Sequence, residues 1–139
     1  MLNPNDLFRV NKAYRIYLDP VCDHHGLTRI ELDILLFLAN SPQYTTASDI
    51  VKRRFLTKSH VSSAIRTLTE KGLIQKEFRN ENKKTVHLIL LSSSEEIIQE
   101  GQQTQIQFIA SLKEGIPSEE MERFKETFSK IMTNADRLL

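Results

Sequence analysis

Cysteine is nearly absent from this 139-residue chain, since Cys22 is the only one. A single thiol cannot form an internal disulfide and provides no CxxC pair for zinc, so neither cross-link can hold the fold together. Glycine and proline are scarce, with four residues each, and tryptophan does not occur. With 40% hydrophobic residues, this composition is typical of a helix-rich domain stabilised by packing, and it argues against disorder or a fibrous repeat.

Long hydrophobic runs are missing as well. No stretch approaches the roughly 18 consecutive apolar residues that a transmembrane helix needs. Residues 1–6 lack the basic-then-apolar order of a secretory signal. We therefore expect the protein to stay in the cytoplasm.

Signatures of catalysis are also lacking. The sequence contains no Ser/His/Asp set, no paired-carboxylate motif, no glycine loop that could cradle phosphate and no metal-ligand spacing. Its length suits about one domain. We predict a single domain, residues 1–139, that is not an enzyme and uses no cofactor or metal.

The charge is unevenly distributed, although the net charge is only +1. Residues 52–84 contain 10 Lys/Arg against 3 Asp/Glu, whereas residues 1–51 and 85–139 are both net acidic. A polyanion such as nucleic acid would therefore bind the middle of the chain. A solvated charged face is the alternative explanation.

Hydrophobic periodicity predicts six helices and one β-hairpin, so the fold class is mainly α. Thr28 with Glu31 forms a capping-box pattern, Thr46 and Thr57 are suitable N-caps, and Gly72 suits a left-handed helix end. The helices are expected at about 4–24, 28–40, 46–54, 58–71, 93–114 and 118–139, and the hairpin at about 74–91.

Three further boundary signals refine this assignment. Pro20 is expected to kink or end the first helix. Ser93 with Glu96 reads as a second capping box, and Ser118 is expected to cap the last helix after the break at residues 115–117.

The helix expected at 58–71 has two distinct faces. Its apolar residues follow the spacing of a buried stripe: Val61, Ala64, Ile65 and Leu68. About 200° around the helix lie Ser59, Ser62, Ser63 and Arg66, with His60 and Thr67 at the margin. Short hydroxyl side chains let a helix approach the floor of the DNA major groove, so this face is a candidate base-reading surface, although an ordinary polar face is the alternative.

A short helix precedes this helix and a basic hairpin follows it, which is the order of a winged helix-turn-helix. The residues Asn82, Lys83 and Lys84 are expected at the tip of the wing, where cations suit the minor groove or flanking phosphates. A solvated turn would explain the same residues.

Residues 56–74 (LTKSHVSSAIRTLTEKGLI) resemble the recognition helix of the MarR-type winged-helix regulators, with the staphylococcal SarA-type regulators as close relatives. The resemblance covers nearly the whole chain. It implies contacts to bases and phosphates from the serines and His60, and contacts to the DNA backbone from Lys58 and Arg66. The DNA-binding residues expected are Thr57, Lys58, Ser59, His60, Ser62, Ser63, Arg66, Asn82, Lys83 and Lys84. The family commonly has Asp, one variable residue and Arg at the wing tip, so we expect a looser wing contact here.

The first and last helices each carry an apolar stripe that one chain need not cover. The resemblance implies that both ends intertwine with a second copy, placing a winged-helix lobe at about 28–91 and dimerisation helices at about 4–24 and 94–139. The interface residues expected are Leu7, Val10, Tyr14, Phe124, Phe128, Ile131, Ala135 and Leu138.

The regulatory signal is less well specified by the sequence. Cys22 fits a buried structural thiol better than a redox sensor. Cys22, His24 and His25 are not expected to bind metal, because adjacent histidines should point to different sides of a helix. Tyr14 and Tyr17 either line an effector pocket or pack in the core.

Together these features predict a homodimeric transcriptional regulator that binds double-stranded DNA at a palindromic operator. Repression relieved by a small-molecule effector is the expected mode of action. The alternative is a winged helix used for protein contact, which would need an apolar surface in place of the serine-rich face.

Overall fold

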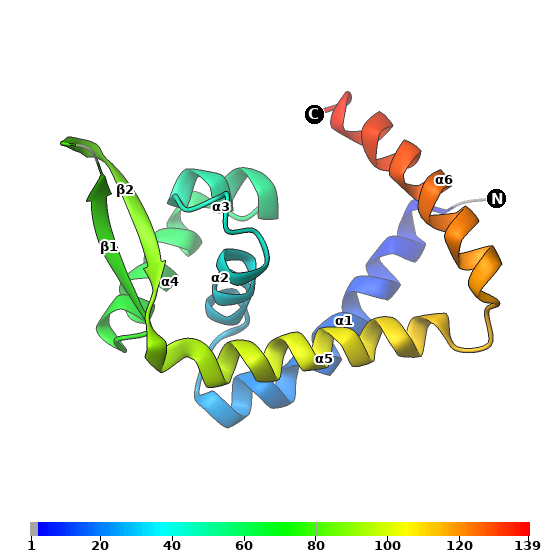
Figure 1. The fold of residues 1–139 in the computed structure, drawn as a ribbon, viewed down its shortest axis with the longest axis horizontal. Helices are drawn as coiled ribbons and strands as arrows, with labels where there is room; N and C mark the ends of the chain where they lie inside the picture. The colour runs from blue at the N-terminus through cyan, green and yellow to red at the C-terminus, as the bar shows by residue number, and fades with distance from the viewer. Residues whose placement is uncertain (1–2, 80) are drawn as a thin grey trace. The chain divides into compact units, whose positions relative to one another are not determined.

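The computed structural model describes residues 3–79 and 81–139. It confirms the predicted class, mainly helical with one β-hairpin (Figure 1). The order of elements is α1 (Pro4–His25), α2 (Arg29–Asn40), α3 (Ala47–Arg54), α4 (Lys58–Glu70), β1 (Ile74–Arg79), β2 (Asn82–Leu90), a 3-10 turn (Ser92–Ser94), α5 (Glu95–Lys113) and α6 (Ser118–Asp136). No helix in the described part of the chain is both long and apolar enough to cross a membrane.

The chain divides into two compact units, residues 1–105 and residues 106–139, with the boundary inside α5. The first unit contains the winged helix, α1 and the first half of α5. The predicted grouping of α1 with the C-terminal helices as a dimerisation domain therefore stays a prediction.

Helix starts in the first unit follow the capping signals in the sequence. The Thr28 hydroxyl accepts a hydrogen bond from the Glu31 N–H, and the Glu31 carboxylate accepts one from the Thr28 N–H, which confirms the predicted capping box. Thr46 and Asp49 form a second capping box at the start of α3. Such caps stabilise a helix by about 1 kcal/mol each because they satisfy N–H groups that have no partner inside the helix.

Two predicted helix caps were wrong, and of the two outcomes expected at Pro20 the end of the helix did not occur. Helix α1 contains Pro20 and continues to His25, where Gly26 adopts a left-handed conformation with φ of 63°. The Ser93 hydroxyl donates to the carbonyl of Gly72 instead of capping α5, so a 3-10 turn precedes that helix. Ser118 is the first residue of α6, and its N-cap is Pro117.

The core of the first unit lies between α1, α2, α3, α4, the base of the hairpin and the start of α5. Its fully buried members include Leu18, Leu32, Leu35, Ile50 and Leu68. Helix α4 packs against α2 and α3, and the end of α1 packs against α2. This core fixes the orientation of α4, the helix with the serine-rich face.

The two strands form an antiparallel hairpin in which Ile74 is paired with Leu90 and Arg79 with Asn82. The first strand has one buried residue, Ile74, at the base, while its outer residues are exposed. In Figure 1 the hairpin extends beyond α4 as a narrow arm. This is the geometry of a wing.

The second unit consists of the end of α5 and all of α6. Helix α6, which is described throughout, contains no buried residue. Its apolar residues therefore lie on the surface of this single chain.

Candidate nucleic-acid interface

Helix α4 has the two faces that its sequence predicts. Val61, Ala64, Ile65 and Leu68 are all buried, and Leu68 has no exposed surface. The opposite face is exposed and contains Ser59, Ser62, Ser63 and Arg66, with His60 beside it. The protein's own fold therefore leaves this face open.

A tight turn sets the angle between α3 and α4. Phe55 ends α3 in the left-handed conformation, with φ of 53°, which is uncommon for a residue with a side chain. Two residues later the Thr57 hydroxyl accepts a hydrogen bond from the His60 N–H, which confirms Thr57 as the cap of α4. Helix, turn and helix thus follow within residues 47–70.

The first turn of α4 is suited to an anion. It contains Lys58 and no acidic residue, and the positive end of the helix dipole adds to that charge. Backbone N–H groups at such an end bind phosphate oxygens readily. The polar face and the helix start therefore favour the same kind of partner.

The base of the wing is tied to the helix-turn-helix. The Leu88 N–H donates to the Thr45 carbonyl at 2.8 Å, and a 2.6 Å hydrogen bond joins the Thr45 hydroxyl to His87 Nδ1. The Leu91 N–H donates to the Leu73 carbonyl and closes the hairpin. Thr45 and His87 carry no recognisable sequence signal, so sequence reasoning missed this tether.

The predicted position of the wing tip needs a correction. Asn82, Lys83 and Lys84 lie in β2, because the strand begins at Asn82 and not near Thr85. The turn lies before them, where Glu81 has a positive φ of 62° and Asn80 falls outside the described residues.

Asn82 has a structural role at the start of β2. Its side-chain Oδ1 accepts a hydrogen bond from the Lys84 N–H at 3.0 Å, and its side-chain Nδ2 donates to the Thr85 hydroxyl. These contacts fix the backbone that carries both lysines. Lys83 and Lys84 remain exposed on the wing, as predicted.

Part of the basic segment is engaged within the protein. Arg54 contacts Asp33 at 3.7 Å, Lys71 contacts Glu31 at 3.4 Å, and Arg79 contacts Glu77 at 3.3 Å. These contacts reduce the positive charge that the segment presents to a partner. The exposed cations on α4 and the wing that carry no described ion pair are Lys58, Arg66, Lys76, Lys83 and Lys84.

Most of the residues predicted at a dimer interface lie on the surface of the isolated chain, whereas Tyr14 is half-buried against the core. Leu7 is 66% exposed, Phe124 52% and Leu138 87%, and the rings of Phe124 and Phe128 stack. Val10, Phe128 and Ile131 are also exposed, whereas Ala135 is half-buried. Sequence reasoning missed further exposed apolar residues on α1 and on α5: Phe8, Ile16, Ile106, Ile109 and Leu112.

The two tyrosines differ in their surroundings. The Tyr14 hydroxyl accepts a hydrogen bond from the Gln105 side chain at 2.6 Å, and the Arg29 guanidinium lies 5.3 Å from the centre of its ring. Tyr17 is more exposed. Tyr14 therefore packs in a polar network, and an effector pocket at these tyrosines stays a prediction.

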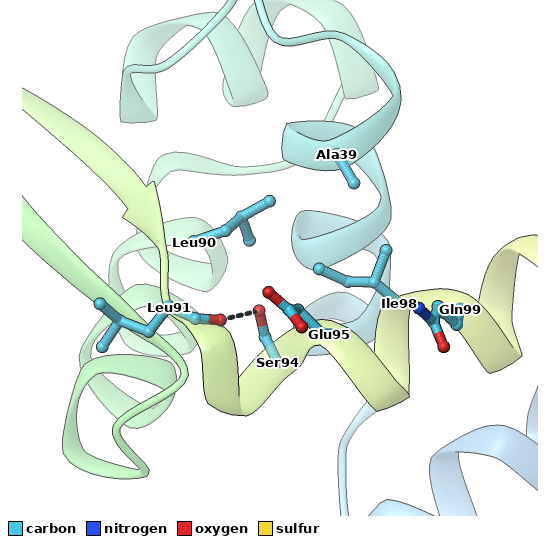
Figure 2. A pocket seen from close by; sticks show the side chains of 7 residues that line it. All are labelled: Ala39, Leu90, Leu91, Ser94, Glu95, Ile98 and Gln99. Carbon is cyan, nitrogen blue, oxygen red and sulfur yellow. Dashed lines mark hydrogen bonds between the residues drawn. The ribbon is translucent and has the colours of Figure 1, made fainter.

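A small hollow lies elsewhere in the first unit, between the end of α2, the end of β2 and the start of α5 (Figure 2). It has a volume of about 370 Å³ and is lined by Ala39, Leu90, Leu91, Ser94, Glu95, Ile98 and Gln99. In Figure 2 the Ser94 hydroxyl donates to the Leu91 carbonyl at 2.7 Å. Neither tyrosine lines this hollow.

Cys22 is buried in the core, as the sequence predicted. Burial raises the pKa of its thiol, although the nearby Arg29 opposes this shift. A raised pKa disfavours the reactive thiolate.

The expectation that His24 and His25 point apart was wrong. Both rings face one carboxylate, that of Glu100 on α5, and their centroids are 4.3 Å apart. The sequence could not indicate this cluster, because Glu100 lies 75 residues away and belongs to no motif.

Comparison with known proteins supports the winged-helix assignment. A model of the MarR family matches residues 25–84, from the end of α1 into β2. No curated protein matches the chain in sequence.

Many solved structures share the fold. A putative MarR family regulator from Listeria monocytogenes, solved with a 26mer DNA, is 18% identical with a TM-score of 0.84, covering 96% of this chain and 89% of its own. The S. aureus MepR–DNA complex is 20% identical with a TM-score of 0.77, covering 96% and 99%. A MarR family regulator from Silicibacter pomeroyi is 17% identical with a TM-score of 0.81, covering 94% and 88%. At these identities the likeness establishes the fold, and the relation to SarA-type regulators stays a prediction.

Proposed function

We propose that this chain is a MarR-family transcriptional regulator that binds double-stranded DNA with α4 in the major groove and the β1–β2 wing beside it. The observation that carries this proposal is the exposed face of α4. Its three serines and Arg66 are exposed. The buried residues on the other side of α4, among them Leu68, anchor the helix in the core. Two proteins of the same fold were solved with DNA, which is consistent with this use of the fold.

The side chains on this face fit two separate tasks. Ser59, Ser62 and Ser63 are short enough to let the helix axis come close to base edges, where a hydroxyl can donate or accept. Lys58 and Arg66 flank them and would neutralise backbone phosphates. Specificity would therefore depend mainly on the serines, and affinity mainly on the cations.

We also propose a homodimer formed through the ends of the chain. The apolar residues of α1 and α6 are exposed in the single chain, and large exposed apolar patches usually mark interfaces. A two-fold pair would present two α4 helices to half-sites about 34 Å apart along the duplex. A palindromic operator follows from that symmetry, and repression by blocking a promoter is the simplest output.

The test is a fluorescence-anisotropy titration of labelled duplex, selected from a random DNA pool by the purified protein. Ser62→Ala should reduce discrimination between the selected site and competitor DNA, because a base or phosphate hydrogen bond is lost. Arg66→Ala should weaken binding to both. Arg123→Ala, an exposed arginine on α6, is the matched control and should leave both affinities unchanged.

Two outcomes would contradict the proposal. One is a wild-type protein whose affinity for the selected duplex equals that for competitor DNA. The other is unchanged binding in the Ser62→Ala, Arg66→Ala double variant. Either result would favour a winged helix used for protein contact.

A further inference from the structure

Three potential metal-ligand side chains converge at the junction of α1 and α5. His24 Nδ1 lies 3.0 Å from Glu100 Oε2, and His25 Nε2 lies 2.5 Å from the same oxygen. One ligand atom of each residue lies within 4.8 Å of the ligand atoms of the other two. All three residues belong to the compact unit of residues 1–105.

The chain ends α1 in a way that brings both rings to the same place. His25 is the last residue of the helix, and Gly26 then turns the chain back with its N–H donating to the Cys22 carbonyl. Glu100 is held within α5, where its carbonyl accepts a hydrogen bond from the Thr104 hydroxyl. The cluster thus joins two secondary-structure elements that are far apart in sequence.

We propose that His24, His25 and Glu100 form a binding site for a divalent first-row transition ion of the zinc type. Two imidazole nitrogens and one carboxylate oxygen are a ligand set that zinc accepts, with one coordination position left for water. Imidazole ligands favour zinc, nickel or copper over magnesium or calcium, which prefer oxygen alone.

Metal binding requires a rearrangement of the three side chains. Ligand atoms about 2.0–2.1 Å from a tetrahedral zinc ion lie roughly 3.3–3.4 Å from each other. The ligand atoms here lie up to 4.8 Å apart, so the two histidine nitrogens must approach each other by as much as roughly 1.4 Å. The carboxylate oxygen already lies close to this separation from His24 and must retreat by less than about 1 Å from His25. The ring of His25 is held by its surroundings, at 13% side-chain exposure, whereas His24 at 63% is free to adjust.

Hydrogen bonding alone is the competing explanation for the cluster. Bonds from His25 and then His24, against the opposing effect of partial burial, lower the pKa of Glu100 and keep it ionised. Binding would replace the shared protons with the ion and release them to solvent.

The decisive experiment uses the untagged full-length chain, stripped with a chelator and dialysed against zinc, with cobalt(II) as a spectroscopic probe. We expect one ion per chain and a visible cobalt band of a low-coordinate site. Glu100→Gln and His25→Gln should each weaken binding by more than the roughly 100-fold that an outer-shell partner contributes. His60→Gln, which removes an exposed histidine on α4, is the matched control and should bind zinc as the wild type does.

Two results would overturn the site. The wild-type chain could take up less than one equivalent of zinc, or the His24→Gln, Glu100→Gln double variant could keep the wild-type affinity. Both substitutions lie at side chains with access to solvent, and circular dichroism of each variant checks that the helices are intact. The measurement is independent of DNA, so failure of the proposed regulator function would leave it unaffected.

Discussion

Replacing Lys84 with alanine tests the wing through the salt dependence of DNA binding. The Lys84 side chain is exposed on β2, and the Lys84 backbone N–H donates to the Asn82 side-chain Oδ1 at 3.0 Å. The substitution therefore removes one cation without removing a core contact. We expect weaker DNA binding and a smaller salt slope.

The size of the effect follows from the number of cations on the proposed face. Lys58, Arg66, Lys83 and Lys84 give four per protomer, so a dimer that uses all of them at about 0.9 per phosphate would have a slope near −7. Lys84→Ala removes two contacts per dimer and lowers the magnitude of the slope by about 1.8. As the salt concentration rises from about 50 to about 200 mM, the ratio of the wild-type affinity to the Lys84→Ala affinity would then fall by roughly 12-fold.

The assay is anisotropy of one labelled duplex, selected by the wild-type protein, at four or more salt concentrations. Lys125→Ala is the matched control, because it removes the same charge from α6, where Lys125 pairs with Glu122 at 3.1 Å. Its slope should equal that of the wild type. A slope that is unchanged in Lys84→Ala, or lowered equally in Lys125→Ala, would refute a wing contact with phosphate.

The remaining predictions address stability and assembly. Leu68→Ala should lower the free energy of unfolding in urea by about 2–5 kcal/mol, because the side chain is fully buried, and a change below about 1 kcal/mol would contradict the anchored face. Burial acts to raise the pKa of Asp49, but hydrogen bonds from Thr46 and Thr45 and the charge of Lys52 outweigh it and lower the pKa. A carboxyl group whose pKa is lower in the folded state than in the unfolded state stabilises the fold at pH values above its unfolded pKa. This stabilisation is lost as the pH falls through the folded pKa. Asp49→Asn should therefore be less stable than the wild type near neutral pH, and its free energy of unfolding in urea should approach that of the wild type near pH 3. Phe128→Asp should convert a dimer to a monomer by light scattering with the helical circular dichroism retained, and an intact dimer would exclude this stripe from the interface.

Local signals in the sequence predicted the elements that have them. Helix α4 is an example, because a capping threonine, a regular apolar stripe and Gly72 agree on its start, buried face and end. Gly72 has a positive φ of 72°, as a left-handed helix end requires. Where each level of signal agrees, sequence reasoning locates both an element and its exposed face.

Errors occurred where a distant contact decided the local structure. Ser93 resembled a helix cap, yet its hydroxyl is used by the carbonyl of Gly72, 21 residues earlier. The start of β2 at Asn82 depends on pairing with Arg79 across the turn. The polar residues of this segment give no hydrophobic pattern from which that pairing could be predicted. Glu100 was overlooked for the same reason, since its partners are set by how α1 and α5 pack and not by spacing.

The hydrogen bonds of Thr45 with Leu88 and His87 couple the wing to the loop that begins α3. Two strands alone form a marginal structure, so without this anchor the arm would pivot freely about its base. With these hydrogen bonds, α4 and the base of the β1–β2 wing meet a duplex as one rigid unit with a fixed separation. Any accommodation to grooves of different width must then occur near Glu81, at the far end of the arm.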